Sequence, residues 1–157
     1  MQTLLTTPVT MEVLDLTFER EMLGWPGARN FRLEPIEESG GMFAVLRCLD
    51  EVVLHSGATV NELTFLVTPP GWLWPDYRIE LDEEFADGLG LVVPDEAALL
   101  AIVCQREPVE RSTVNLFSPI VLNRFTGAAD QFVPPMREEE SGWSVRTPFP
   151  TSPSMDG

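Results

Sequence analysis

The feature that most limits the fold of this chain is a succession of short apolar runs, each soon interrupted by glycine, proline or polar turn residues. The runs alternate apolar and polar positions or are rich in β-branched residues, which is typical of strands rather than helices. They are Met11–Phe18, Phe31–Ile36, Met42–Leu49, Leu63–Thr68, Leu99–Gln105, Ser112–Phe117 and Ile120–Phe125. No run repeats at a fixed period, so a solenoid is excluded. The sequence therefore predicts many short, closely spaced strands.

Two segments interrupt this pattern. Residues 69–77 contain Pro69, Pro70 and Pro75, which exclude a helix interior and a central strand and predict an ordered loop. The following segment, Asp82–Gly88, has an Asp N-cap, acidic residues in its first turn and a Gly stop, which predict a short helix. The predicted fold is mainly β: a small antiparallel β-barrel-like single domain, or a curved sandwich, with one or two short helices.

The length of 157 residues suits one domain. We assign that domain to residues 10–149. The polar, Thr-rich residues 1–9 are expected to form a flexible leader. Residues 150–157 lack apolar content and are expected to form a disordered tail.

The charge of the chain is strongly negative. It has 25 acidic and 10 basic residues, for a net charge of −15, and every basic residue is an arginine. Such a surface repels phosphate backbones, which disfavours direct nucleic-acid binding. The same field attracts a basic partner, so a protein that itself binds RNA is a plausible ligand.

Targeting and membrane signals are also missing from this sequence. The first arginine is Arg20, so no cationic region begins the chain, and the longest apolar run, Ala97–Cys104, is too short to span a bilayer. We therefore expect a cytoplasmic protein that does not enter the membrane. Both Cys48 and Cys104 lie in apolar strand-like runs, and we expect them to be reduced, buried thiols.

The sequence offers little for catalysis. His55 is the single histidine and lies in a Gly/Ser/Thr-rich turn, which indicates an exposed loop residue rather than a catalytic base. Without a Cys-x-x-Cys pair, no set of metal ligands has a recognisable spacing, so we expect no metal and no cofactor. The adjacent acids Glu83 and Glu84, and those in Glu138–Glu140, are typical of solvated faces, which favours a protein that is not an enzyme. A carboxylate-dependent hydrolase remains the less favoured alternative.

The proline-rich loop carries the strongest candidate for a binding site. Its aromatic residues either line the core or form a rigid contact platform, and the sequence leaves both open. Eight acidic residues lie between Asp76 and Glu96 against the single Arg78, so the loop combines anchor side chains with a negative field. Among Trp72, Trp74 and Tyr77, Tyr77 is expected to be the most buried, because it precedes a strand-like segment. The candidate partner-binding residues are Trp72, Trp74, Asp76, Tyr77, Glu80, Asp82, Glu83 and Glu84.

Two segments resemble motifs of the flagellar assembly factor FliW family. Leu63–Pro70, followed by Trp74–Tyr77, is similar to the Phe-Leu-Val-x-x-Pro…Asp-Tyr signature of that family. Ser112–Arg124 resembles its Thr-Val-Asn-Leu-x-x-Pro-Ile-x-x-Asn block. With the weaker matches at Gly24–Gly27 and Ser144–Phe149, the resemblance covers about residues 11 to 149 in collinear order.

The resemblance implies a non-enzymatic regulator with a small β-barrel-like fold. Members of the family bind the RNA-binding translational repressor CsrA, relieve its repression of flagellin mRNA, and bind flagellin in a chaperone-like way. The motif residues Pro69, Asn115, Pro119 and Asn123 are expected to be structural. The two asparagines in particular are expected to satisfy backbone groups of a loop or bulge. An acidic β-barrel interaction module without a flagellar role is the alternative.

Overall fold

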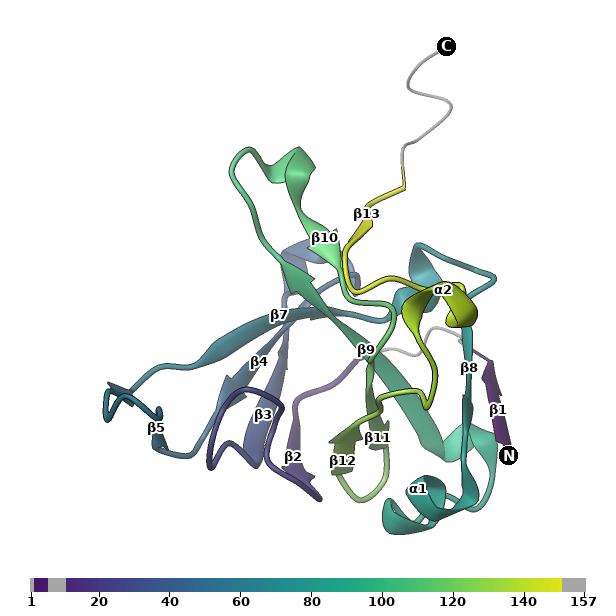
Figure 1. Cartoon of the computed structure of the whole chain (residues 1–157), viewed down its shortest axis with the longest axis horizontal. Coiled ribbons are helices and arrows are strands. Elements are labelled where there is room, and N and C mark those ends of the chain that lie inside the picture. Colours follow the sequence, from purple (N-terminus) through teal and green to yellow (C-terminus); the bar gives the residue numbers. More distant parts are fainter. Residues whose placement is uncertain (1, 6–10, 151–157) are drawn as a thin grey trace.

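A closed seven-strand barrel forms the centre of the molecule (Figure 1). The computed structural model describes residues 2–5 and 11–150. The strands follow the order β11-β12-β2-β3-β4-β7-β9, and β9 pairs again with β11 to close the barrel. Their bounds are β2 (Leu14–Phe18), β3 (Asn30–Pro35), β4 (Ala44–Cys48), β7 (Thr64–Thr68), β9 (Ala97–Cys104), β11 (Ile120–Asn123) and β12 (Ala128–Gln131). The predicted mainly-β barrel is confirmed.

The remaining elements extend or cover the barrel. Short strands β10 (Thr113–Val114) and β13 (Thr147–Pro148) continue the sheet beside the end of β9, and β5 (Val52–Val53) pairs with β6 (Thr59–Val60) in a separate hairpin. Outside the barrel, β8 (Arg78–Leu81) pairs with β1 (Gln2–Leu5). The helices are α1 (Glu83–Gly88) and α2 (Glu138–Ser141), with 3-10 turns η1 (Glu37–Ser39), η2 (Pro70–Trp72), η3 (Pro94–Glu96) and η4 (Val109–Arg111).

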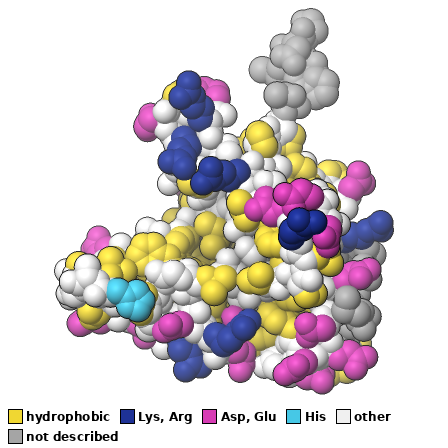
Figure 2. Space-filling view, in the orientation of Figure 1, with side chains coloured by type: hydrophobic (Ala, Val, Ile, Leu, Met, Phe, Trp, Pro, Cys, Tyr) yellow, Lys and Arg dark blue, Asp and Glu magenta, His cyan; other side chains and the backbone are white. Residues whose placement is uncertain are grey.

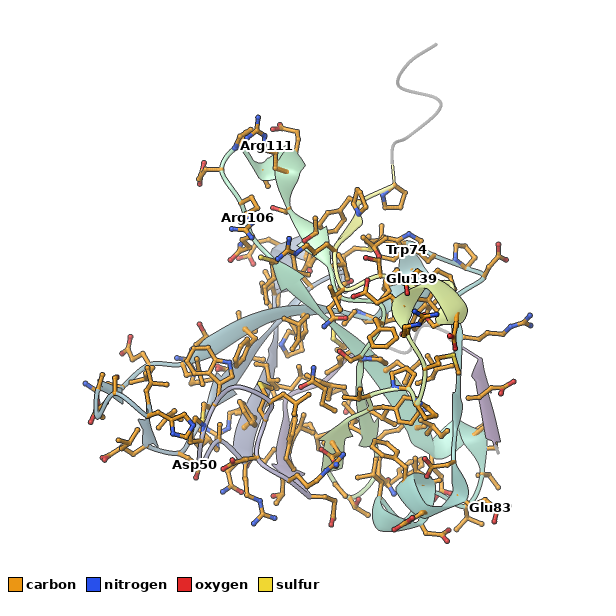
Figure 3. All side chains as sticks on the ribbon, viewed as in Figure 1. Asp50, Trp74, Glu83, Arg106, Arg111 and Glu139 are labelled. Carbon is orange, nitrogen blue, oxygen red and sulfur yellow. The ribbon has the colours of Figure 1, made fainter. Side chains whose placement is uncertain are left out.

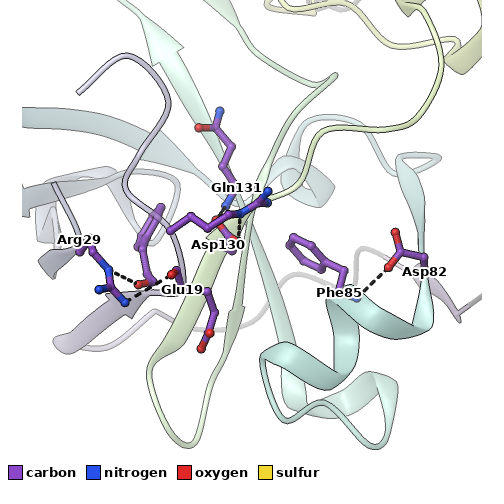
Figure 4. A network of polar contacts seen from close by, with 8 residues as sticks. Glu19, Arg29, Asp82, Phe85, Asp130 and Gln131 are labelled. Carbon is purple, nitrogen blue, oxygen red and sulfur yellow. Dashed lines mark hydrogen bonds and ion pairs between the residues drawn. The ribbon is translucent and has the colours of Figure 1, made fainter. Parts of the chain in front are cut away.

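One neighbouring pair in the barrel, β2 and β12, is parallel, unlike the antiparallel pairing predicted throughout. The backbone N–H of Thr17 donates to the carbonyl oxygen of Gly127 at 2.9 Å. Gly127 has a φ of +82°, and a Cβ added there would collide with the carbonyl oxygen of Asp15, so only glycine fits. Beside this seam, Nε of Arg20 donates to the carboxylate of Asp130 at 2.9 Å (Figure 4).

Two apolar clusters lie on opposite faces of β9. The first fills the barrel and includes Phe18, Phe31 and Leu100. The second packs between the outer face of the barrel and the β8–α1 segment, and includes Tyr77 and Val121. Because successive strand residues point to opposite faces, β9 and β11 supply side chains to both clusters, which is why their sequences are apolar almost throughout.

The start of the chain differs from the sequence prediction. A flexible leader is predicted over residues 1–9, but Gln2–Leu5 form β1, paired with β8 in antiparallel register. The physical reason is that an unpaired β8 would expose a row of backbone donors and acceptors. The rest of the predicted leader and residues 151–157 of the predicted tail lie outside the described residues.

The cysteines, the segment Ser112–Phe117 and the lengths of the helices also bear on the sequence predictions. Cys104 is exposed at the end of β9 and Cys48 is only partly buried, so the prediction of two buried thiols is wrong. The segment Ser112–Phe117 contributes only the two-residue β10, because Asn115 begins a turn that diverts the chain. In the part of the chain that the structure describes, no helix has the length and apolar character of a membrane span.

Candidate partner-binding surface

The predicted helix is present as α1, and Asp82, one of the acidic candidates, caps its N-terminus. The carboxylate of Asp82 accepts a hydrogen bond from the backbone N–H of Phe85 at 2.7 Å (Figure 4). This is the N-cap geometry that the sequence predicts. Glu83 and Glu84 follow in the first turn, where negative charge is favourable beside the helix N-terminus. All three acidic side chains are exposed.

The proline-rich loop is an ordered turn whose aromatic side chains have different environments. The backbone N–H of Trp74 donates to the carbonyl oxygen of Pro70 at 2.9 Å, and that of Tyr77 donates to the carbonyl oxygen of Trp74 at 2.9 Å. Trp72 is 46% exposed. Trp74 is partly buried, with its ring centroid 6.3 Å from that of Phe149. Of the two tryptophans, Trp72 therefore offers the larger surface for contact.

Tyr77 is a core residue and does not belong to the contact surface. It is 1% exposed, its hydroxyl donates to the carbonyl oxygen of Leu116 at 2.7 Å, and its ring packs edge-to-face on Trp143 with centroids 4.8 Å apart. Burial raises the pKa of its phenol well above the usual value, since the phenolate would lose hydration. Its place in the candidate set is therefore corrected, as the strand-like residues after it already suggest.

Strand β8 divides the remaining candidates into two groups. Asp76 precedes the strand, Glu80 lies on its exposed face, and Ile79 and Leu81 point into the second core. A four-residue strand covers about 13 Å, so the loop and α1 lie at its two ends. Figure 3 shows this separation: Trp74 lies at the α2 end of the molecule, and Glu83 lies on α1 at the other end.

The structure adds a cleft that the sequence did not predict, which we call the β8–α2 cleft. It has a volume of about 390 Å³ and lies between β8 and the segment 134–143. Two predicted candidates, Asp76 and Glu80, line it, whereas Asp82, Glu83 and Glu84 do not. The residues that define it for the argument below are Asp76, Ile79, Glu80, Met136, Glu140 and Trp143. A tryptophan just after the acidic run Glu138–Glu140 was the available sequence signal.

Charge is distributed unevenly over the face shown in Figure 2. Acidic side chains gather over α1 and around α2, whereas arginines gather on the projecting β9–β10 arm. Figure 3 places Arg106 and Arg111 on that arm. The predicted acidic surface therefore lies along the β8–α1 side of the molecule.

The motif residues that were expected to be structural lie at turns and at the ends of strands. The amide oxygen of Asn115 accepts hydrogen bonds from the backbone N–H groups of Phe117 at 3.1 Å and Ser118 at 3.0 Å, which forms a turn. The amide nitrogen of Asn123 donates to the carbonyl oxygen of Leu89 at 3.0 Å and so ties β11 to the end of α1. Both asparagines thus make hydrogen bonds to backbone groups.

The two motif prolines are buried beside turns. Pro69 is the residue that precedes η2. Pro119 precedes β11, and its carbonyl oxygen accepts a hydrogen bond from the backbone N–H of Phe132 at 2.9 Å. Both therefore help to fix where a strand ends or begins.

The groups considered for catalysis lie apart. His55 is exposed in the turn between β5 and β6. Glu83 and Glu84 lie on α1, whereas Glu140 lies at the cleft and pairs with Arg137 at 3.3 Å. Within residues 2–5 and 11–150, no group of three or more His, Cys, Asp or Glu side chains is placed to hold a metal ion.

Comparison with known proteins decides the family. The family model described as FliW protein matches residues 2–149. The chain belongs to the FliW family. A relative from Exiguobacterium, named flagellar assembly factor FliW, is 33% identical over 111 residues, which are 71% of this chain and 70% of the relative. One of the same name from Oceanobacillus iheyensis is 31% identical over 108 residues, or 68% of this chain and 74% of the relative.

A solved structure supports the same fold. The crystal structure of a flagellar assembly factor FliW has a TM-score of 0.69 to this chain at 23% sequence identity, covering 90% of this chain and 92% of the other. The FliW barrel is thus the observed fold. The resemblance inferred from Leu63–Pro70 and Ser112–Arg124 is confirmed at the level of the family.

Proposed function

We propose that this FliW-family chain is a non-enzymatic, cytoplasmic flagellar assembly factor. It binds a basic RNA-binding repressor of the CsrA type, which relieves repression of flagellin mRNA, and it binds flagellin in a chaperone-like way. It needs no cofactor and contacts neither nucleic acid nor membrane directly. Two relatives that match most of this chain carry the name flagellar assembly factor.

The observation that carries the proposal is the acidic β8–α1 side of the molecule with an exposed tryptophan near its end. Trp72 is 46% exposed, and Asp76, Glu80 and Glu84 are exposed along the same segment of chain. Large aromatic anchors beside charged side chains are typical of protein interfaces. The net charge of −15 favours association with a basic protein and opposes association with RNA.

The proposal is tested by calorimetric titration of the purified chain with the CsrA-type repressor and, separately, with flagellin from the same organism. We expect saturable binding to both, and weaker binding to the repressor as salt is added, because the Debye length is about 10 Å at 0.1 M. The repressor should release flagellin mRNA in a gel shift when this chain is added. Absence of binding to both proteins would contradict the proposal and favour an acidic interaction module with no flagellar role. A shift of bare RNA by this chain alone would contradict it as well.

A further inference from the structure

The β8–α2 cleft has the size of a site for one or two side chains. Its volume of about 390 Å³ lies at the lower end of the range of about 300–1,000 Å³ for sites that enclose small ligands. Apolar residues from both sides line it: Met136 from the segment before α2, Trp143 from the segment after it, and, from β8, Ile79, which is 7% exposed and otherwise buried in the second core. Met136 is 42% exposed. An apolar side chain placed there would cover surface that now faces solvent.

The walls of the cleft are held in place before any ligand binds. The hydroxyl of Ser141 donates to the carbonyl oxygen of Glu138 at 2.8 Å and accepts from the backbone N–H of Trp143 at 3.0 Å. The Trp143 ring packs on Tyr77, which is itself tied to Leu116. Binding therefore requires little ordering of the receptor, which favours affinity for a short segment.

The charges at the cleft favour a cation beside that apolar group. Among the described residues that line it, Asp76, Glu80 and Glu140 are acidic and only Arg78 is basic. Glu140 already pairs with Arg137. Asp76 and Glu80 make no ion pair or hydrogen bond with other side chains within the described residues, and both are exposed. Two carboxylates are thus available to a ligand at the edge of an apolar cleft.

We infer that the β8–α2 cleft is the site that takes a short basic segment of the partner, with one large apolar side chain in the cleft and a flanking arginine or lysine at Asp76 and Glu80. The inference rests on the proposed function only for the identity of the protein that carries the segment. The acidic side chains on α1 then attract the partner through the long-range electrostatic field of the protein and make no direct contact with the bound segment.

The test uses a probe that does not depend on the partner. A short peptide, Gly-Arg-Phe-Arg-Gly, is titrated into the ¹⁵N-labelled full chain while the indole N–H signal of Trp143 is followed by NMR. That signal is identified by its loss in Trp143→Phe. We expect a saturable shift of the Trp143 signal, absent when alanine replaces the peptide phenylalanine or glutamate replaces its arginines.

A matched pair of variants separates contact from general charge. Asp76→Asn with Glu80→Gln removes two charges at the cleft, and Asp87→Asn with Glu84→Gln removes the same two kinds of charge on α1. We expect the Kd of the peptide to rise at least about tenfold in the first variant and to stay within about twofold in the second. Circular dichroism checks that both variants fold.

Three results would overturn the inference. One is a Trp143 signal that does not move with peptide, and another is an equal loss of affinity in the two variants. The third is a Trp143 shift that grows with protein concentration alone, which would assign the cleft to a second copy of the chain. The proposed function fails separately: if the whole repressor does not bind but the peptide shifts Trp143, the cleft stands and its natural partner is another basic protein.

Discussion

The hydroxyl of Tyr77 allows a sharp test of how the contact surface is supported. Tyr77→Phe removes one hydrogen bond of 2.7 Å and leaves the carbonyl oxygen of Leu116 without that donor in the core. Leaving a buried acceptor unsatisfied costs about 1–3 kcal/mol. For a chain of this size each kcal/mol lowers the Tm by about 2–4 °C. A loss of about 2 kcal/mol therefore predicts a Tm about 4–8 °C lower at neutral pH, measured by scanning calorimetry.

The same residue predicts a pH dependence whose sign is fixed by burial. The pKa of Tyr77 is raised in the folded chain because burial disfavours the phenolate, whereas the unfolded chain ionises near the ordinary value of about 10. The contribution of the protonated Tyr77 side chain to the free energy of unfolding is therefore fully present below pH 10. It is lost as pH rises above 10, because only the unfolded state releases the proton. In Tyr77→Phe this alkaline loss should be absent, so the difference in Tm between the two proteins should shrink above pH 10.

The composition makes this experiment unusually clean. Tyr77 is the only tyrosine, so the near-ultraviolet absorbance of tyrosinate reports on Tyr77 alone. The chain has no lysine, so no lysine titrates in the same pH range. The folded protein should show no tyrosinate at a pH of about 10.5, where free tyrosine is mostly ionised. Half-ionisation near pH 10 in the folded state, or an unchanged Tm in Tyr77→Phe, would refute the assignment of this residue to the core.

Three further tests, which use five substitutions, probe other parts of the structure. Trp72→Ala should weaken partner binding by about 2 kcal/mol, or about thirtyfold, as for aromatic hot spots, while Trp74→Ala should chiefly lower the free energy of unfolding, by about 2–3 kcal/mol. Titration with the partner and urea unfolding of both variants measure these effects. A binding loss in Trp74→Ala and a stability loss in Trp72→Ala would contradict the prediction. Gly127→Ala should lower the free energy of unfolding by about 2 kcal/mol or more, because the added Cβ meets the Asp15 carbonyl. The control Gly57→Ala, also at positive φ but with open space around the added Cβ, should lower it by about 1 kcal/mol. Equal losses in the two variants would disprove the close approach at Gly127. His55→Ala should change neither repressor binding nor Tm measurably, and a large loss of both would show that this exposed turn has a role.

Features governed by neighbouring residues could be predicted from the sequence. The cap of α1 needs only Asp82 and a backbone N–H three residues later, and the turn at Asn115 needs only the next three residues. The acidic charge and the distinct position of Tyr77 could also be predicted, because composition and strand alternation are local properties. These local features, together with the family motifs, were enough to predict a barrel built from many short strands.

The β8–α2 cleft could not be predicted, because it joins segments that are distant in the sequence. Its walls come from β8 and from the residues around Met136 and Trp143, and no spacing rule says that these meet. The parallel pairing of β2 with β12 has the same origin. Likewise, the ring of Trp74 packs against that of Phe149, which lies far from it in the sequence.

The seam between β2 and β12 links the order of synthesis to the time at which the barrel can close. The Arg20–Asp130 ion pair beside it spans 110 residues, so β2 emerges from the ribosome long before its partner exists. Until β12 arrives, hairpins β2–β3–β4 can form locally, but the outer edge of β2 stays unpaired, and contacts between such distant residues form slowly. An open strand edge on a nascent chain is prone to pair with another chain. Slow synthesis of the residues up to Asp130 therefore lengthens the time during which the edge of β2 is open, and a chain that stops before β12 cannot form this seam.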